Sequence, residues 1–183
     1  DTTPNGQGRM ELCQLDQDIK EISRFRIPAP EKDDTYCEKN WMPIIDMPYH
    51  FVKWSNPTEV VKVDPINKTC ETVHLGSYVE KPFDYRGGSQ VITLGDYRVA
   101  LTHTCNLFKS EQGKKNAIYE HSFIVWDKDF NFVGLSKENI SFLEAPIEFC
   151  IGAAVYGEDL LLGIGVQDNC AFVLRTPGSV VDE

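Results

Sequence analysis

Charged and amide side chains stand directly before apolar, strand-like runs at three places in this sequence of 183 residues. The residues concerned are Lys39 and Asn40, Arg86 and Gln90, and Glu148. Lysine and arginine supply fixed positive charge that suits a phosphate or a carboxylate, and arginine can bind either group through two parallel hydrogen bonds. The three segments therefore predict an anion-binding or sugar-binding site. The alternative is an ion pair between one of the cations and Glu148, with no ligand.

Two histidines and an aspartate occupy comparable positions in other apolar runs. His103 and Asp168 each end such a run, and His121 begins one. A histidine in this position can transfer a proton, although it is more often a hydrogen-bonded packing residue. The pattern itself identifies no catalytic residue, and Glu148 and Asp168 are the candidates for a catalytic carboxylate.

Aromatic residues and glycines lie beside the basic residues. Trp41 and Trp54 can stack on the face of a sugar, but aromatic residues near strand ends usually pack in a core. Gly87-Gly88 permits a close approach of the backbone, or a tight turn.

Short β-branched or aromatic runs dominate the chain and predict an all-β fold. The clearest runs are residues 44–54, 91–94, 97–103, 121–126, 149–155, 160–166 and 171–174. A polar entry, an apolar strand, a glycine-acid turn and a second strand recur at intervals of about 50 to 60 residues, the size of a four-stranded propeller blade. We therefore expect a β-propeller whose inner strands begin near Trp41, Gln90 and Phe149 and run side by side about one axis.

With a hairpin over residues 10–27, the repeat amounts to about three and a half blades, fewer than a closed propeller has. We expect one partial propeller domain over residues 1–183, with further blades from the same full-length protein or from a homo-oligomer. Because residue 1 is aspartate, we also expect a mature form or an excised piece.

Composition excludes several classes of function. A formal net charge of −10 disfavours nucleic acid and anionic membranes as partners, and no apolar run approaches the ~20 residues of a membrane span. The six cysteines contain no CxxC pair, which favours reduced thiols over zinc ligands. Disulfide bonds are the alternative in an oxidising compartment. We expect a soluble, cytoplasmic protein without a metal, or a secreted one if the cysteines and the sequons at Asn67 and Asn139 are used.

Five segments resemble a group of five-bladed propeller proteins related to the β-mannoside phosphorylases and β-mannosidases of glycoside hydrolase family 130. They are residues 38–41, 86–90, 119–123, 147–153 and 163–168, and the resemblance covers most of residues 37–174. It implies that Lys39 and His103 contribute to a phosphate site, that Arg86 is a further anion ligand, and that Asp168 ends a conserved strand motif. The general acid of that family is an aspartate on an early blade, and nothing before Cys37 matches its surroundings.

The resemblance implies a carbohydrate-active propeller, a glycoside phosphorylase or hydrolase acting on mannoside-like glycans. This chain would supply the sugar and phosphate contacts, with inorganic phosphate as a possible co-substrate and no other cofactor. The expected substrate-binding residues are Lys39, Asn40, Arg86, Gln90, His103, His121, Glu148 and Asp168. The alternative is a non-catalytic glycan-binding or scaffold propeller associated with a glycosyltransferase, because a fold does not determine a function.

Overall fold

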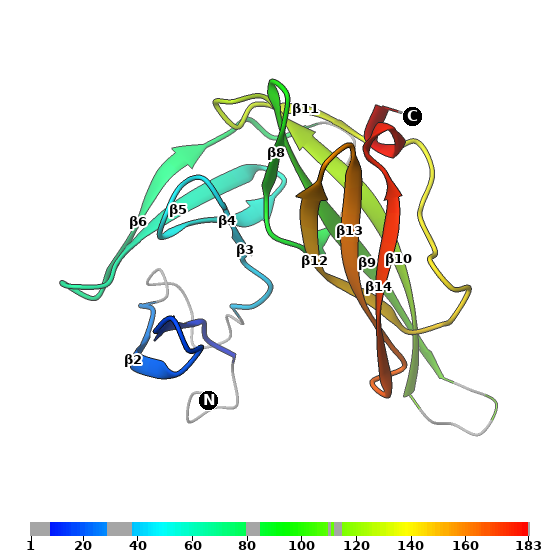
Figure 1. The fold of residues 1–183 in the computed structure, drawn as a ribbon, viewed down its shortest axis with the longest axis horizontal. Coiled ribbons are helices and arrows are strands. Elements are labelled where there is room, and N and C mark those ends of the chain that lie inside the picture. Colours follow the sequence, from blue (N-terminus) through cyan, green and yellow to red (C-terminus); the bar gives the residue numbers. More distant parts are fainter. Residues whose placement is uncertain (1–7, 29–37, 80–84, 110, 112–114, 183) are drawn as a thin grey trace.

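The structure is a computed structural model that describes residues 8–28, 38–79, 85–109, 111 and 115–182. Its strands form antiparallel sheets that follow one another in chain order (Figure 1). The first sheet is the hairpin β1 (Glu11–Leu15) and β2 (Glu21–Arg26). The second has the order β3 (Met42–Pro43), β4 (His50–Ser55), β5 (Thr58–Asp64) and β6 (Thr69–Leu75).

The third sheet is built on two long strands, β9 (Tyr97–Lys109) and β10 (Lys115–Trp126). On the far side of β10 lies β11 (Phe132–Leu135), and the other edge of β9 pairs with both β7 (Arg86–Gly87) and β8 (Ile92–Leu94). The fourth sheet has the order β12 (Glu148–Tyr156), β13 (Asp159–Val166) and β14 (Cys170–Pro177), and a 3-10 helix, η1 (Gly178–Asp182), follows it. The predicted all-β class is confirmed, and none of the sheets closes on itself.

Local sequence accounts for most of these strands. In β13 the alternate residues Leu160, Leu162, Ile164 and Val166 are buried, as expected for a strand with one face on a core. The turns before β9 and β13 contain Gly95 and Gly157 at φ 57° and 64°, where a residue without a side chain is favoured. The run expected over residues 44–54 divides instead, because residues 45–49 form a turn between β3 and β4.

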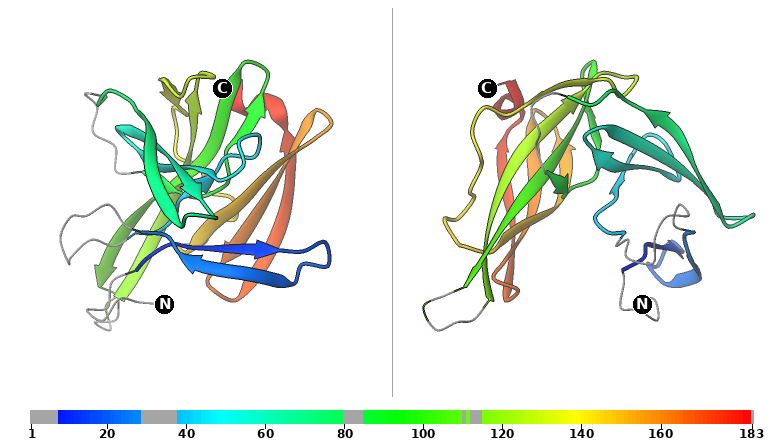
Figure 2. Two further views of the ribbon diagram at one scale, coloured as in Figure 1. Left: turned by 90° about the vertical axis from the view of Figure 1, so that its left-hand side faces the viewer. Right: turned by 180° about the vertical axis from the view of Figure 1, so that it is seen from behind.

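Apolar side chains fill the space between each pair of neighbouring sheets. One core joins the hairpin to the second sheet, one joins the second sheet to the third, and one joins the third to the fourth. Their central residues are, in that order, Ile27, Trp41 and Val63; Met42, Val60 and Trp126; and Leu101, Phe123 and Leu162. Packed in this way, the sheets form an arc, with the hairpin at one end and the fourth sheet at the other (Figures 1 and 2).

Hydrogen bonds link the innermost segments of three sheets. The segment after β3 forms a parallel bridge with the segment before β8, in which Val91 N–H donates to Pro43 O at 2.7 Å. The side chain of Gln90 then reaches β12, where its Oε1 accepts from Ala153 N–H at 3.1 Å and its Nε2 donates to Ala153 O. The segments beginning near Trp41, Gln90 and Phe149 therefore lie side by side.

Gly87 and Gly88 stand where these three sheets meet. A Cβ at Gly87 would overlap the carbonyl oxygen of Asn40, and one at Gly88 would lie 2.7 Å from Leu101 O and 3.0 Å from Cys150 O. Both glycines have ordinary φ angles, so the close approach of the backbone, and not a turn, is what excludes a side chain here.

Five cysteines are free thiols, and Cys37 lies outside the described residues. Cys150 is buried, whereas Cys13 and Cys170 are exposed. Within the described residues, no helix combines the length and hydrophobicity of a membrane span.

We expect Gly87→Ala to lower the free energy of unfolding by about 2 kcal/mol, because the added methyl group has no room beside Asn40. Urea titration followed by circular dichroism measures this loss. Gly134→Ala in β11 is the matched control, since nothing lies within 4 Å of the position of its Cβ, and it should change stability by no more than about 0.5 kcal/mol. Equal effects of the two substitutions would contradict the packing argument.

Candidate functional site

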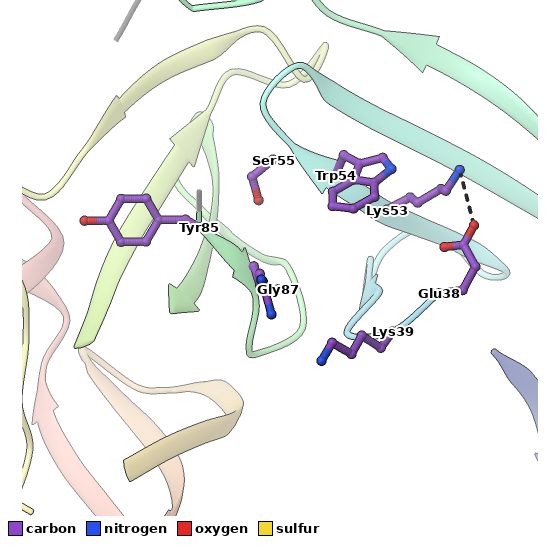
Figure 3. Close-up of a pocket in the computed structure, with 8 residues that line it drawn as sticks. Glu38, Lys39, Lys53, Trp54, Ser55, Tyr85 and Gly87 are labelled. Atoms are coloured by element: carbon purple, nitrogen blue, oxygen red, sulfur yellow. Dashed lines mark ion pairs between the residues drawn. The ribbon is translucent and has the colours of Figure 1, made fainter. Parts of the chain in front are cut away.

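A cavity of about 320 Å³ lies between the entry to β3, the end of β4 and the start of β7 (Figure 3). Its lining residues are Glu38, Lys39, Lys53, Trp54, Ser55, Tyr85, Arg86 and Gly87. Two residues predicted from the sequence, Lys39 and Arg86, are among them. The lining holds three basic side chains and one acidic side chain, in a chain whose net charge is −10. Because Lys53 is paired with Glu38 and Glu59, the positive charge of the lining rests on Lys39 and Arg86.

Two backbone irregularities place the side chains around this cavity. Asn40 has φ 60°, in the left-handed region that asparagine tolerates, and the turn leaves Lys39 exposed while Trp41 enters the core. A register shift between Val52 and Trp54 interrupts the alternation of β4. As a result Lys53 is buried, whereas Trp54 is 41% exposed at the cavity.

Buried charges form one wall of the cavity. Lys53 Nζ lies 3.6 Å from Glu38 Oε1 and 3.5 Å from Glu59 Oε2, and Trp41 Nε1 donates to Glu38 Oε2 at 2.8 Å. Burial raises the pKa of Glu38 above its usual value, and the Trp41 N–H group and the charge of Lys53 offset this only in part. Ion pairing to two carboxylates orients Lys53, so this wall is held rigidly.

His103 lies directly beside the cavity because β7 pairs with β9 and sets Arg86 opposite His103. The imidazole is 3% exposed, stacks on Tyr119 at 5.7 Å between ring centroids, and meets the edge of Phe149 at 4.7 Å. Burial lowers the pKa of His103 to about 4, and the charges of His121, Arg86 and Lys39 act in the same direction. His103 is therefore a neutral packing residue at neutral pH.

Asp168 approaches the same group of residues from the fourth sheet. It is exposed in the turn between β13 and β14, at φ 52°. The pKa of Tyr119 is raised by a hydrogen bond with the Cys105 side chain, by burial and by the charge of Asp168, whereas Arg86 acts to lower it. The charges of Lys39 and Arg86 thus act on His103, and the charges of Arg86 and Asp168 act on Tyr119.

Glu148 does not join them. It is completely buried, and its carboxylate accepts from the backbone N–H groups of Phe142, Leu143 and Ala145 at 2.7 to 2.8 Å. The Ser141 hydroxyl lies 3.4 Å from Glu148 Oε2. Burial acts to raise the pKa of Glu148, but the three amide donors outweigh it and leave the pKa below its usual value. The expectation that Glu148 pairs with a rim cation or a sugar hydroxyl is wrong, because its carboxylate organises the loop before β12.

Three other predicted residues hold the framework. His121 is completely buried, and its Nε2 accepts from Cys150 N–H at 3.2 Å. Burial lowers the pKa of His121, while the Ile140 carbonyl and the charge of Glu148 act to raise it. The side-chain amide of Gln90 is bound to Ala153, and Asn40 supplies the turn before β3. The side chains of His121 and Gln90 thus join the third sheet to the fourth.

Sequence reasoning assigned no role to four residues of the cavity, namely Glu38, Lys53, Ser55 and Tyr85. A lysine within an apolar run is a recognisable signal, since a buried lysine needs a paired carboxylate. Ser55 is 4% exposed, and its Oγ has no hydrogen-bond partner in the part of the chain that the structure describes. Of the two tryptophans considered for stacking, Trp54 reaches the cavity and Trp41 packs in a core.

The lining suits an anion and an adjoining flat apolar face. Lys39 and Arg86 offer charged donors, and Trp54 offers an exposed indole. Among the described residues, no group of three or more histidines, cysteines, aspartates or glutamates is arranged to hold a metal ion.

We expect Glu148→Gln to destabilise the fold by about 3 kcal/mol, because one amide oxygen cannot replace a carboxylate that serves three backbone donors. Hydrogen exchange should accelerate most at Phe142, Leu143 and Ala145. The control is Glu144→Gln in the same loop, where the side chain is exposed. Unchanged exchange at the three amides would show that Glu148 does not hold the loop.

We expect stability to fall as the pH drops from about 6.5 to about 4, because unfolded His103 binds a proton in this range and folded His103 does not. The shift corresponds to at most about 3 kcal/mol. His103→Phe keeps an aromatic ring against Tyr119 and should flatten this part of the stability profile, measured by urea titration at each pH. His50→Phe, on β4 and away from Tyr119, is the control and should leave the dependence of the unfolding free energy on pH unchanged. If His103→Phe and wild type show the same dependence, His103 is not its cause.

No family model, curated protein or solved structure matches the chain.

Proposed function

We propose that the chain is part of a carbohydrate-active β-propeller and that the cavity binds an acidic or phosphate group together with the adjoining sugar of a glycan. The propeller is supported by the order of the sheets, each packed face to face on the next, and by the hydrogen bonds that set their innermost segments side by side. In propellers the rim around these inner strands is where binding sites are built.

One observation carries the ligand class: Lys39 and Arg86 line the same cavity as the exposed face of Trp54. Basic side chains supply charge-assisted hydrogen bonds to an anion, and an indole provides an apolar surface for the face of a sugar ring. A volume of about 320 Å³ lies at the lower end of the range for small-molecule sites and suits a single sugar unit with its anionic group.

Binding is the activity that this geometry supports best. Glu148, one of the two carboxylates considered for catalysis, accepts from three backbone donors away from the cavity. Glu38 lines the cavity but accepts from Trp41 and is paired with Lys53. A binding role needs neither carboxylate.

A second candidate function is phosphorolysis or hydrolysis of mannoside-like glycans, and the position of Asp168 favours it. Asp168 is exposed, and its charge raises the pKa of Tyr119, which the charge of Arg86 acts to lower. Inverting phosphorolysis needs a phosphate on one face of the sugar and an acid that protonates the glycosidic oxygen on the other. Lys39 and Arg86 would hold the phosphate, and Asp168 is the carboxylate available as the acid.

We expect Lys39→Ala and Arg86→Ala each to weaken phosphate binding by about 1.5 to 3 kcal/mol, the typical contribution of a hydrogen bond to a charged group. Calorimetry with inorganic phosphate, mannose 1-phosphate and a panel of neutral mannosides measures the loss. Trp54→Ala should weaken binding of the sugars and leave inorganic phosphate unaffected. Lys20→Ala, an exposed lysine on the hairpin, is the control for the loss of one positive charge.

Unchanged phosphate affinity in both Lys39→Ala and Arg86→Ala would contradict the proposal and favour a scaffold role for the chain. Turnover of a mannoside with phosphate that Asp168→Asn abolishes, with phosphate affinity retained, would identify the chain as an enzyme.

A further inference from the structure

Among the described residues the fourth sheet holds three strands, which leaves the position beside the outer edge of β14 without a strand. In the second sheet β3 to β6 occupy four successive positions, and in the third sheet β7 and β8 share one position beside β9, β10 and β11. The fourth sheet contains only β12, β13 and β14, after which the chain leaves the sheet as η1. Within the described residues nothing pairs with the outer edge of β14.

Strand β14 also lacks the features that protect free edges in natural sheets. Such edges are short or carry charges that prevent pairing with another chain. The outer strand β11 has four residues, and β6 carries Glu71. By contrast β14 has eight residues and one charged side chain, Arg175, whose Nε donates to Asp159 Oδ2 on β13 at 2.6 Å.

Apolar surface is uncovered around this edge. Phe172 is 44% exposed and Val173 is 74% exposed. A cavity of about 600 Å³, lined by apolar side chains of β9, β10 and β11, adjoins the C-terminal end of β14, because Gly178 and Val181 of η1 belong to its wall. An added strand at β14 would cover apolar groups on a chain that is otherwise strongly acidic.

We propose that a second copy of this chain fills the position, with the two β14 strands pairing antiparallel about a two-fold axis at Val173. In that register Phe172 faces Leu174 of the other copy, Ala171 faces Arg175, and Cys170 faces Thr176. The centre of the strand is thus self-complementary: Val173 faces Val173, Phe172 faces Leu174, and no like charges meet along the pairing. The two three-stranded sheets then form one continuous six-stranded sheet, and the interface is isologous, as in most homodimers.

The self-association of the chain tests this proposal by sedimentation equilibrium. Wild type should form a dimer that dissociates on dilution. Val173→Lys and Val173→Glu should each weaken the dimer on the order of 100-fold, because each places two like charges opposite one another on the two-fold axis. An equimolar mixture of the two variants should restore the dimer, since Lys then faces Glu. Restoration in the mixture also shows that both variants fold.

The control is Ile66→Lys, which adds the same charge at a side chain that is 86% exposed in the turn between β5 and β6. This variant should dimerise as wild type does. A wild-type chain that stays monomeric at all concentrations overturns the proposal. Variants that dimerise alone, or a mixture that stays monomeric, place any interface elsewhere and overturn it as well.

Discussion

The arrangement depends on the close approach of three backbones at Gly87 and Gly88. Gly87 lies against the Asn40 carbonyl at the entry to β3, and Gly88 lies between Leu101 of β9 and Cys150 of β12. Any side chain at these positions would separate the sheets by the size of a methyl group, and a closely packed interior does not absorb that change. Because the inner segments meet here, the backbone bridge at Val91 and the amide contacts of Gln90 can form.

The close contact of backbones at Gly87 and Gly88 also assembles the candidate site. Arg86 immediately precedes the glycines, so the contact that joins the sheets also brings this arginine near Lys39 and opposite His103. The charged residues of the site therefore lie at the starts of strands whose positions are fixed by packing. Such residues stay close together without a long loop to carry them. Trp54 reaches the cavity by a separate route, through the register shift in β4.

Buried polar groups hold the surroundings of the site. Glu148 binds three amide groups of one loop, His121 accepts from the backbone of β12, and Lys53 is paired with Glu38 and Glu59. Each of these groups would be costly to bury without its partners, so each requires one particular arrangement of neighbouring segments. These buried groups support the framework, whereas Lys39 and Asp168 are exposed to solvent.

Sequence alone determined the all-β class, the glycine turns before β9 and β13, and the polar entries to the inner strands, because alternation and turn chemistry are local properties. It did not distinguish Arg86 from Glu148, although each precedes an apolar run. Only the tertiary structure decided that Arg86 lines a cavity while Glu148 serves a loop, since the partners of a carboxylate come from other segments. Lys53 and Ser55 joined the site for the same reason: a shift in strand register and the packing of distant segments set their direction.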